Sequence, residues 1–133
     1  MEKFYLEYEG HFDAAHCLRG YSGLCANLHG HRWKVKIQIS GDCLNEIGIL
    51  VDFKDLKKMM KRALPDHCYL NDFPEFAEKN PTAENLAPTL FRIFEQELRG
   101  VEAGVPGTLT LEWVRVWESP EACAMVKRRD SDG

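Results

Sequence analysis

The chain has 133 residues and a mass of 15.3 kDa, which is the size of one domain. Hydrophobic residues make up 44% of it and charged residues 29%, which excludes disordered, collagen-like and membrane-spanning classes. The formal charge of −4 disfavours a nucleic-acid-binding protein, since such proteins usually present a basic face. We expect a single domain over residues 1–126 and a solvated tail over residues 127–133.

Two long strands are predicted in the first third of the chain. Apolar side chains recur at every second position between residues 4 and 12. Residues 31–40 alternate more regularly, with apolar side chains at odd positions and polar ones at even positions, and His31 falls on the apolar face. The apolar run at residues 49–51 predicts a short third strand after a loop.

Two helices are predicted next. Asp52 suits the N-cap of a helix with an apolar stripe at helical spacing, and Pro65 ends that helix. Thr82 suits the N-cap of a second helix with a similar stripe. Pro88 lies inside this second helix and removes one backbone hydrogen bond, so we expect a kink or a displaced start.

A last strand is predicted over residues 109–116. Its apolar alternation changes phase near Trp113, which indicates a bulge or a strand buried on both faces. The order of three strands, two helices and one strand predicts an α+β fold with a four-stranded antiparallel sheet. Such a sheet has exposed edges, and burying them in an oligomer is a natural solution.

The chain does not resemble a secreted or membrane protein. Its N-terminal residues lack the apolar segment of a signal peptide, and no apolar run approaches the ~18 residues of a membrane span. The five cysteines are scattered and odd in number, unlike a small disulfide framework. We therefore expect a cytoplasmic protein without membrane contacts, whose thiols are free for packing, metal binding or catalysis.

The pair His29 and His31 is the first candidate site. Alternate residues of a strand point to the same side, so both imidazoles share one face and favour a divalent metal, zinc first. His16 ends the first predicted strand and can join them if the two long strands pair. Three histidines would leave one coordination position open, as in catalytic zinc sites. Alternatively, each histidine is an ordinary surface or core residue.

Cys25 precedes His29 by four residues and has three possible roles. It can be a fourth zinc ligand that closes the site and makes it structural. It can instead lie near the metal as a thiolate base whose pKa is lowered by positive charge. A buried small side chain is the third possibility.

Two further candidates lie outside the histidine segment. Asp66 and His67 are adjacent in a predicted loop, where a carboxylate and an imidazole can relay protons, although such residues are common in loops. Glu118 ends the last strand, where its carboxylate can accept two hydrogen bonds from an amidine-like edge or simply be solvated.

Together these segments resemble the family of 6-pyruvoyl-tetrahydropterin synthase and its bacterial relative 6-carboxy-tetrahydropterin synthase. The resemblance covers nearly the whole chain and rests on six segments in order: residues 12–16, 25–31, 48–57, 66–71, 81–87 and 118–119. It implies the tunnelling fold, a four-stranded antiparallel sheet with two helices on one face. It also implies trimers that close their sheets into a barrel, homohexamers made of two trimers, and active sites at subunit interfaces.

The resemblance also implies roles for particular residues. Zinc would be held by three histidines: His16, His29 and His31. Cys25 would be the base, with Asp66 and His67 as its proton-relay partners, donated across an interface. Glu118 would bind the amino-pyrimidine edge of the pterin. The implied substrate is 7,8-dihydroneopterin triphosphate, a small molecule, and no nucleic-acid partner is implied.

Two reactions remain open within this resemblance. The pyruvoyl enzyme eliminates triphosphate, whereas the carboxy enzyme also releases acetaldehyde on the route to queuosine, and the spacing from Cys25 to His31 resembles the second. Arg32, Trp33 and Pro65 depart from the usual family residues and put substrate preference in question. A non-catalytic zinc-stapled binding module is the alternative from a different class.

Overall fold

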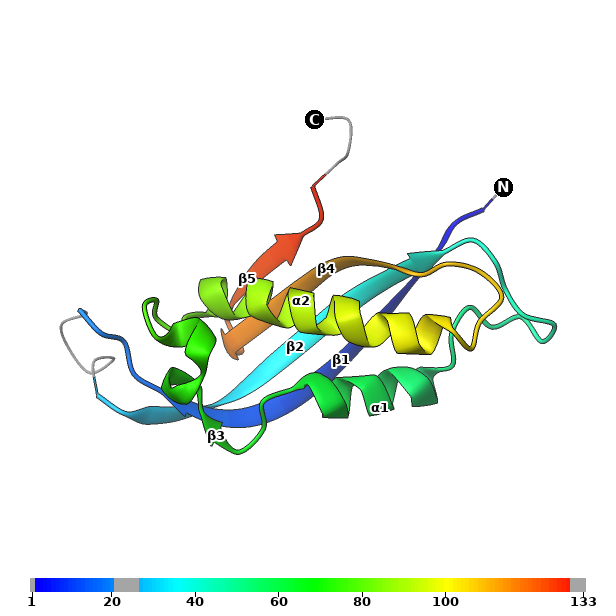
Figure 1. Cartoon of the computed structure of the whole chain (residues 1–133). Helices are drawn as coiled ribbons and strands as arrows, with labels where there is room; N and C mark the ends of the chain where they lie inside the picture. Colours follow the sequence, from blue (N-terminus) through cyan, green and yellow to red (C-terminus); the bar gives the residue numbers. More distant parts are fainter. Residues whose placement is uncertain (1, 21–26, 130–133) are drawn as a thin grey trace.

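The structure, a computed structural model, describes residues 2–20 and 27–129 (Figure 1). Cys25 therefore lies outside the described residues, as do residues 130–133 of the predicted tail. The described part contains a five-stranded sheet with the order β3-β1-β2-β4-β5. Its strands are β1 (Phe4–His16), β2 (His29–Gly41), β3 (Cys68–Tyr69), β4 (Thr110–Ser119) and β5 (Ala122–Lys127).

The two helices lie on the same face of this sheet, as Figure 1 shows. They are α1 (Phe53–Ala63) and α2 (Ala83–Glu102), and two 3-10 turns, η2 (Leu70–Asp72) and η3 (Pro74–Phe76), lie between them. Asp52 and Thr82 cap the helices with their side chains, as predicted, so Pro88 does not displace the start of α2. The predicted α+β class is confirmed.

The core lies between the sheet and the two helices. Alternate residues of β1 and β2 point into it, and Phe12 stacks on Trp33 with ring centroids 5.9 Å apart. The bulge predicted near Trp113 is confirmed, because Gln38 pairs with Trp113 whereas Ile39 pairs with Leu111. This arrangement leaves an extra residue in β4 and changes the phase of its buried side chains.

The predicted strand at residues 49–51 is wrong. Leu50 and Val51 are buried, but this segment forms no ladder with another strand of the described chain. The Asn45 side chain accepts hydrogen bonds from the amides of Ile47 and Ile49, so a tight loop satisfies the backbone instead. Burial alone made this apolar run resemble a strand.

Two strands were not predicted. β3 has only two residues and pairs in parallel with Ala14 and Ala15, while β5 is an antiparallel edge strand beside β4. β5 carries few strongly apolar side chains because one of its edges and one of its faces are exposed. The four antiparallel strands of the sheet are thus β1, β2, β4 and β5. No helix in the described part of the chain is long and apolar enough to cross a membrane.

Candidate functional site

The register of β1 and β2 brings three histidines together at one end of the sheet. His16 pairs directly with His29, and His31 lies two residues further along β2 on the same face. The ring centroids are 4.6 Å apart for His16 and His29, 5.0 Å for His16 and His31, and 4.7 Å for His29 and His31. Strand pairing therefore builds the cluster that the sequence predicted.

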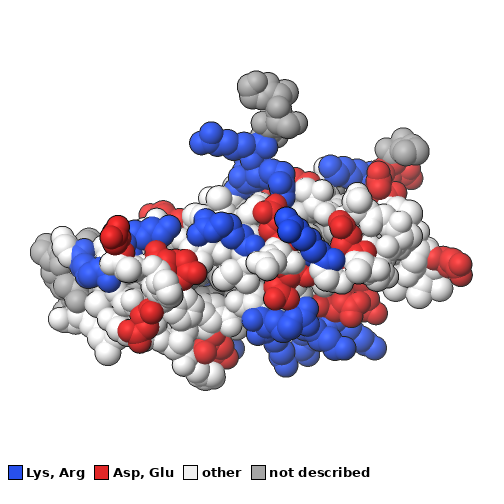
Figure 2. All heavy atoms as spheres, viewed as in Figure 1, with Lys and Arg blue, Asp and Glu red and all other residues white. Residues whose placement is uncertain are grey.

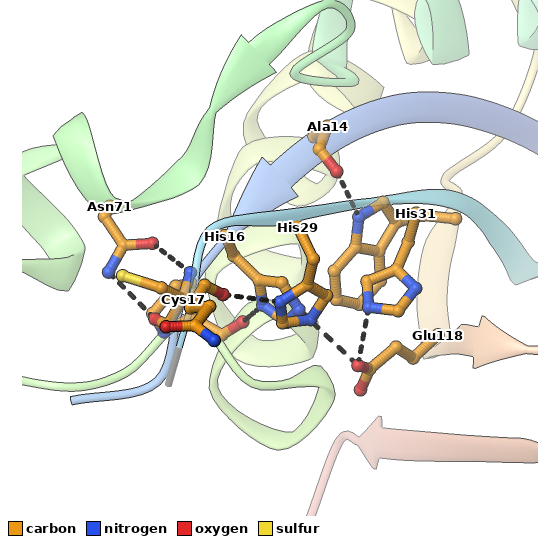
Figure 3. A network of polar contacts seen from close by, with 10 residues as sticks. Ala14, His16, Cys17, His29, His31, Asn71 and Glu118 are labelled. Atoms are coloured by element: carbon orange, nitrogen blue, oxygen red, sulfur yellow. Dashed lines mark hydrogen bonds and ion pairs between the residues drawn. The ribbon is translucent and has the colours of Figure 1, made fainter. Parts of the chain in front are cut away.

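Glu118, near the end of β4, adds a carboxylate to this cluster (Figure 3). Its Oε1 lies 3.0 Å from Nε2 of His31 and 3.5 Å from Nε2 of His16. One donor atom from each of the four residues lies within 4.8 Å of the others. We call these four residues, His16, His29, His31 and Glu118, the histidine–glutamate cluster.

Backbone carbonyls orient two of the three imidazoles. Nδ1 of His16 lies 2.8 Å from the carbonyl oxygen of Pro81, and Nδ1 of His29 lies 2.8 Å from that of Asn27. A carbonyl oxygen only accepts hydrogen bonds, so each Nδ1 carries a proton, and in the neutral ring this leaves the lone pair on Nε2. This tautomer is the one that binds a metal through Nε2, with the opposite nitrogen held in place.

Part of the cluster is shielded from solvent. His16 is fully buried, and Nε2 of His16 and of His31 have no hydrogen-bond partner among the described residues. Burial lowers the pKa of His31; the Glu118 carboxylate opposes this shift, and the neighbouring histidines add to it. Imidazole nitrogens that lack a hydrogen-bond partner and face a carboxylate fit a divalent metal ion.

Two asparagines hold the backbone that follows His16. The Asn71 side chain accepts from the Cys17 amide and donates to the Cys17 carbonyl, at 3.0 Å each (Figure 3). The Asn80 side chain makes the same pair of bonds to Arg19, at 2.8 and 2.9 Å. We call Asn71 and Asn80 the asparagine clamp. It fixes the direction in which the chain leaves the cluster.

Asp66 and His67 form a second polar group after α1. Asp66 accepts a hydrogen bond from the Asp13 amide at 2.8 Å, while the His67 amide donates to the Asp13 carbonyl at 2.7 Å. Nε2 of His67 lies 3.4 Å from Oδ2 of Asp66, and the His67 side chain is 80% exposed. The structure thus attaches the Asp66–His67 pair to the end of β1 and presents the imidazole to solvent.

The histidine–glutamate cluster and the Asp66–His67 pair border one groove. A groove of about 710 Å³ is lined by His31 from the cluster and by His67, and also by Cys68 and Tyr69. Burial raises the pKa of the Cys68 thiol, assisted by Asp66 and by Asp72. Because Cys68 is protonated near neutral pH and donates to the Pro65 carbonyl, it is not a thiolate base.

Sequence reasoning missed three contributors to the site. The Pro81 carbonyl and the asparagine clamp lie more than fifty residues from the groups they hold. Asparagine is common in loops, and a backbone carbonyl has no side-chain signature, so no local pattern indicated their contacts. His11 of β1 is not part of the cluster.

Comparison with known proteins agrees with this geometry. Residues 5–129 match the family model described as 6-pyruvoyl tetrahydropterin synthase. The chain is 34% identical over 115 residues to the 6-carboxy-5,6,7,8-tetrahydropterin synthase of Haemophilus influenzae, covering 82% of this chain and 74% of that protein. It is 37% identical over 109 residues to the protein of the same name from Synechocystis, covering 76% and 78%.

A solved structure is similar over the whole fold. The 6-pyruvoyl tetrahydropterin synthase of Caenorhabditis elegans superposes with a TM-score of 0.77 at 27% sequence identity. The match covers 97% of this chain and 98% of that chain. The elements that carry the histidine–glutamate cluster therefore belong to a fold shared with a solved pterin synthase.

Proposed function

Because the chain belongs to the 6-pyruvoyl tetrahydropterin synthase family, we propose that it is a carbon–carbon lyase of the 6-carboxy-5,6,7,8-tetrahydropterin synthase type. It would convert 7,8-dihydroneopterin triphosphate to 6-carboxy-5,6,7,8-tetrahydropterin with loss of acetaldehyde and triphosphate, as a step towards queuosine. The observation that carries the proposal is the histidine–glutamate cluster, in which Nδ1 of His16 and of His29 is held by a carbonyl oxygen and Nε2 faces the other members. Identities of 34% and 37% to proteins of that name favour it over the pyruvoyl reaction.

Zinc is the metal we assign to the cluster. Three neutral imidazoles are borderline-soft donors, which suit Zn²⁺ better than Mg²⁺ or Ca²⁺. The ligands would be His16, His29 and His31 through their Nε2 atoms. A bound zinc ion would supply Lewis-acid stabilisation of negative charge on the oxygens of the pterin side chain.

We assign proton transfer to Cys25, Asp66 and His67. Cys25 is the base in this proposal, and the raised pKa of Cys68 argues against this thiol of the groove as a competitor. His67 is exposed and lies beside Asp66, so it can exchange protons with a substrate in the groove shared with His31. Asp66 keeps the imidazole close while its other oxygen is held by the Asp13 amide.

We assign recognition of the pterin ring to Glu118. Its side chain is 35% exposed and borders a groove of about 600 Å³ together with His31 and Trp117. A carboxylate there can accept two hydrogen bonds from the amino-pyrimidine edge. A ring bound there would lie beside the cluster on which its side chain would react.

The charge distribution supports an anionic substrate. Figure 2 shows Lys and Arg gathered over α1, although the whole chain has a net charge of −4. Lys57 and Lys61 from this helix line a groove of about 420 Å³ that Asp66 also borders. Cations beside the proposed relay residues raise the local concentration of a triphosphate.

The test is incubation of the zinc-loaded protein with 7,8-dihydroneopterin triphosphate, followed by mass spectrometry of the pterin and a coupled assay for acetaldehyde. We expect 6-carboxytetrahydropterin and one acetaldehyde per turnover. A pyruvoyl product without acetaldehyde would identify the sibling reaction, and no conversion would contradict both.

A matched pair of cysteine variants separates the enzyme from a zinc-stapled binding module. Cys25→Ala should keep its zinc and abolish turnover, whereas Cys123→Ala, at an exposed position of β5, should keep both. Loss of zinc and of folding in Cys25→Ala would instead support a structural cysteine ligand.

A further inference from the structure

The position of Glu118 carries an inference beyond binding of the pterin ring. Its Oε1 contacts Nε2 of His31 at 3.0 Å and Nε2 of His16 at 3.5 Å, yet neither nitrogen forms a hydrogen bond with a described residue. Close polar atoms that lack hydrogen-bond geometry are typical of ligands arranged around one ion. Ligand atoms of a tetrahedral zinc, with bonds of about 2.0–2.2 Å, lie about 3.3 Å apart.

We propose that the Glu118 carboxylate is the fourth ligand of the metal when substrate is absent, and that it leaves the metal when substrate binds. In this exchange the bond from the Glu118 oxygen to the metal breaks, and one from a substrate side-chain oxygen forms. The released carboxylate then receives the amino-pyrimidine edge of the same substrate. This inference rests on the proposed function for the identity of the substrate.

Their supports distinguish His16 and His29 from Glu118. The Nδ1 atoms of His16 and His29 are fixed by carbonyl oxygens at 2.8 Å, and His16 is fully buried. Within the described residues, the Glu118 carboxylate makes no hydrogen bond or ion pair except its contacts with the histidines. Ligands held by a second partner stay in place, and an unsupported carboxylate can turn away.

The surroundings give the carboxylate room to turn. Glu118 is near the end of β4, just before Pro120 at the turn into β5, and it borders the groove of about 600 Å³. The groove also reaches His31, so a ligand that enters it meets the carboxylate and the metal site together. Binding of the ring and opening of the coordination position are thereby coupled through one side chain.

Crystal structures of the zinc-loaded protein, alone and with 7,8-dihydroneopterin, test the exchange directly. We expect a Glu118 oxygen about 2.0–2.2 Å from zinc in the free protein and a substrate oxygen in its place in the complex. A water molecule as the fourth ligand of the free protein, with Glu118 turned away, would overturn the proposal. So would a carboxylate that stays on zinc in the complex.

Metal affinity in solution tests the ligand role without any turnover. In competition with a chromophoric chelator, Glu118→Gln should bind Zn²⁺ roughly tenfold or more weakly than the wild type. Glu121→Gln removes the same charge from the adjacent turn, outside the cluster, and should leave the affinity unchanged. Equal affinities for Glu118→Gln and the wild type would contradict the ligand role. A protein that shows these zinc results but converts no substrate would refute only the proposed reaction.

Discussion

At the scale of single residues, His67 is in an unusual backbone conformation. It is the only non-glycine residue with a positive φ, 56°, in the described part of the chain. The bond from its amide to the Asp13 carbonyl holds it there, beside Asp66. A left-handed backbone conformation raises the free energy of any residue with a Cβ. Such residues cluster at functional sites, where the surrounding contacts hold the backbone in place.

Variants of His67 therefore separate backbone strain from chemistry. His67→Gly should be more stable than His67→Ala by about 1 kcal/mol, because glycine adopts positive φ without a steric penalty. Both variants should lose turnover to the same extent, since both lack the imidazole. Urea denaturation measures the first effect and the lyase assay the second. A glycine variant no more stable than the alanine variant would mean that this backbone conformation carries no strain.

At the scale of elements, the segment between η3 and α2 supports the metal site from outside the sheet. Asn80 and Pro81 are consecutive, and the first holds Arg19 while the second orients His16. Thr82 follows and caps α2 by accepting from the Asn85 amide. The start of a helix and the support of the metal site are thus built from the same three residues.

Loss of the asparagine clamp should weaken metal binding as well as stability. Asn71→Ala and Asn80→Ala each remove two hydrogen bonds to the backbone after His16, so we expect Zn²⁺ affinity to fall roughly tenfold, as for other supporting residues. Asn45→Ala is the control, because Asn45 also accepts two backbone hydrogen bonds but lies beyond the opposite end of β2. It should lower the melting temperature without changing zinc affinity. The same affinity in all three variants would show that the clamp is only structural.

At the scale of the whole molecule, the sheet has open edges on both sides. β3 pairs with β1 only at Ala14 and Ala15, so among residues 2–20 and 27–129 no strand pairs with the rest of the outer edge of β1. β5 is the last strand on the other side. Unpaired edges favour association. The trimers and hexamers that the family resemblance implies stay a prediction for this chain.

Mixed oligomers test whether one active site uses two subunits. If Cys25 and His67 of a site come from different chains, then mixing inactive Cys25→Ala and His67→Ala subunits restores intact sites. Random mixing in equal amounts should restore roughly a quarter of the wild-type turnover. Because His31 and His67 border one groove of a single chain, a site within one subunit is the competing arrangement, and it predicts no recovery.

The sequence by itself determined the α+β class, both helix caps, the bulge in β4 and the histidines on one strand face. These features depend on local periodicity and on residue types with strong conformational preferences. The same local patterns predicted a strand at residues 49–51 that does not form, because an apolar run indicates burial and not backbone pairing.

Only the tertiary structure decided how the site is completed. It brought Glu118 onto the histidines, the Pro81 carbonyl onto His16 and the asparagine clamp onto the backbone that follows. These contacts join residues more than fifty positions apart, and they depend on strand register and helix packing. Carbonyl, amide and carboxylate groups occur throughout any chain, so their role arises from where the fold places them.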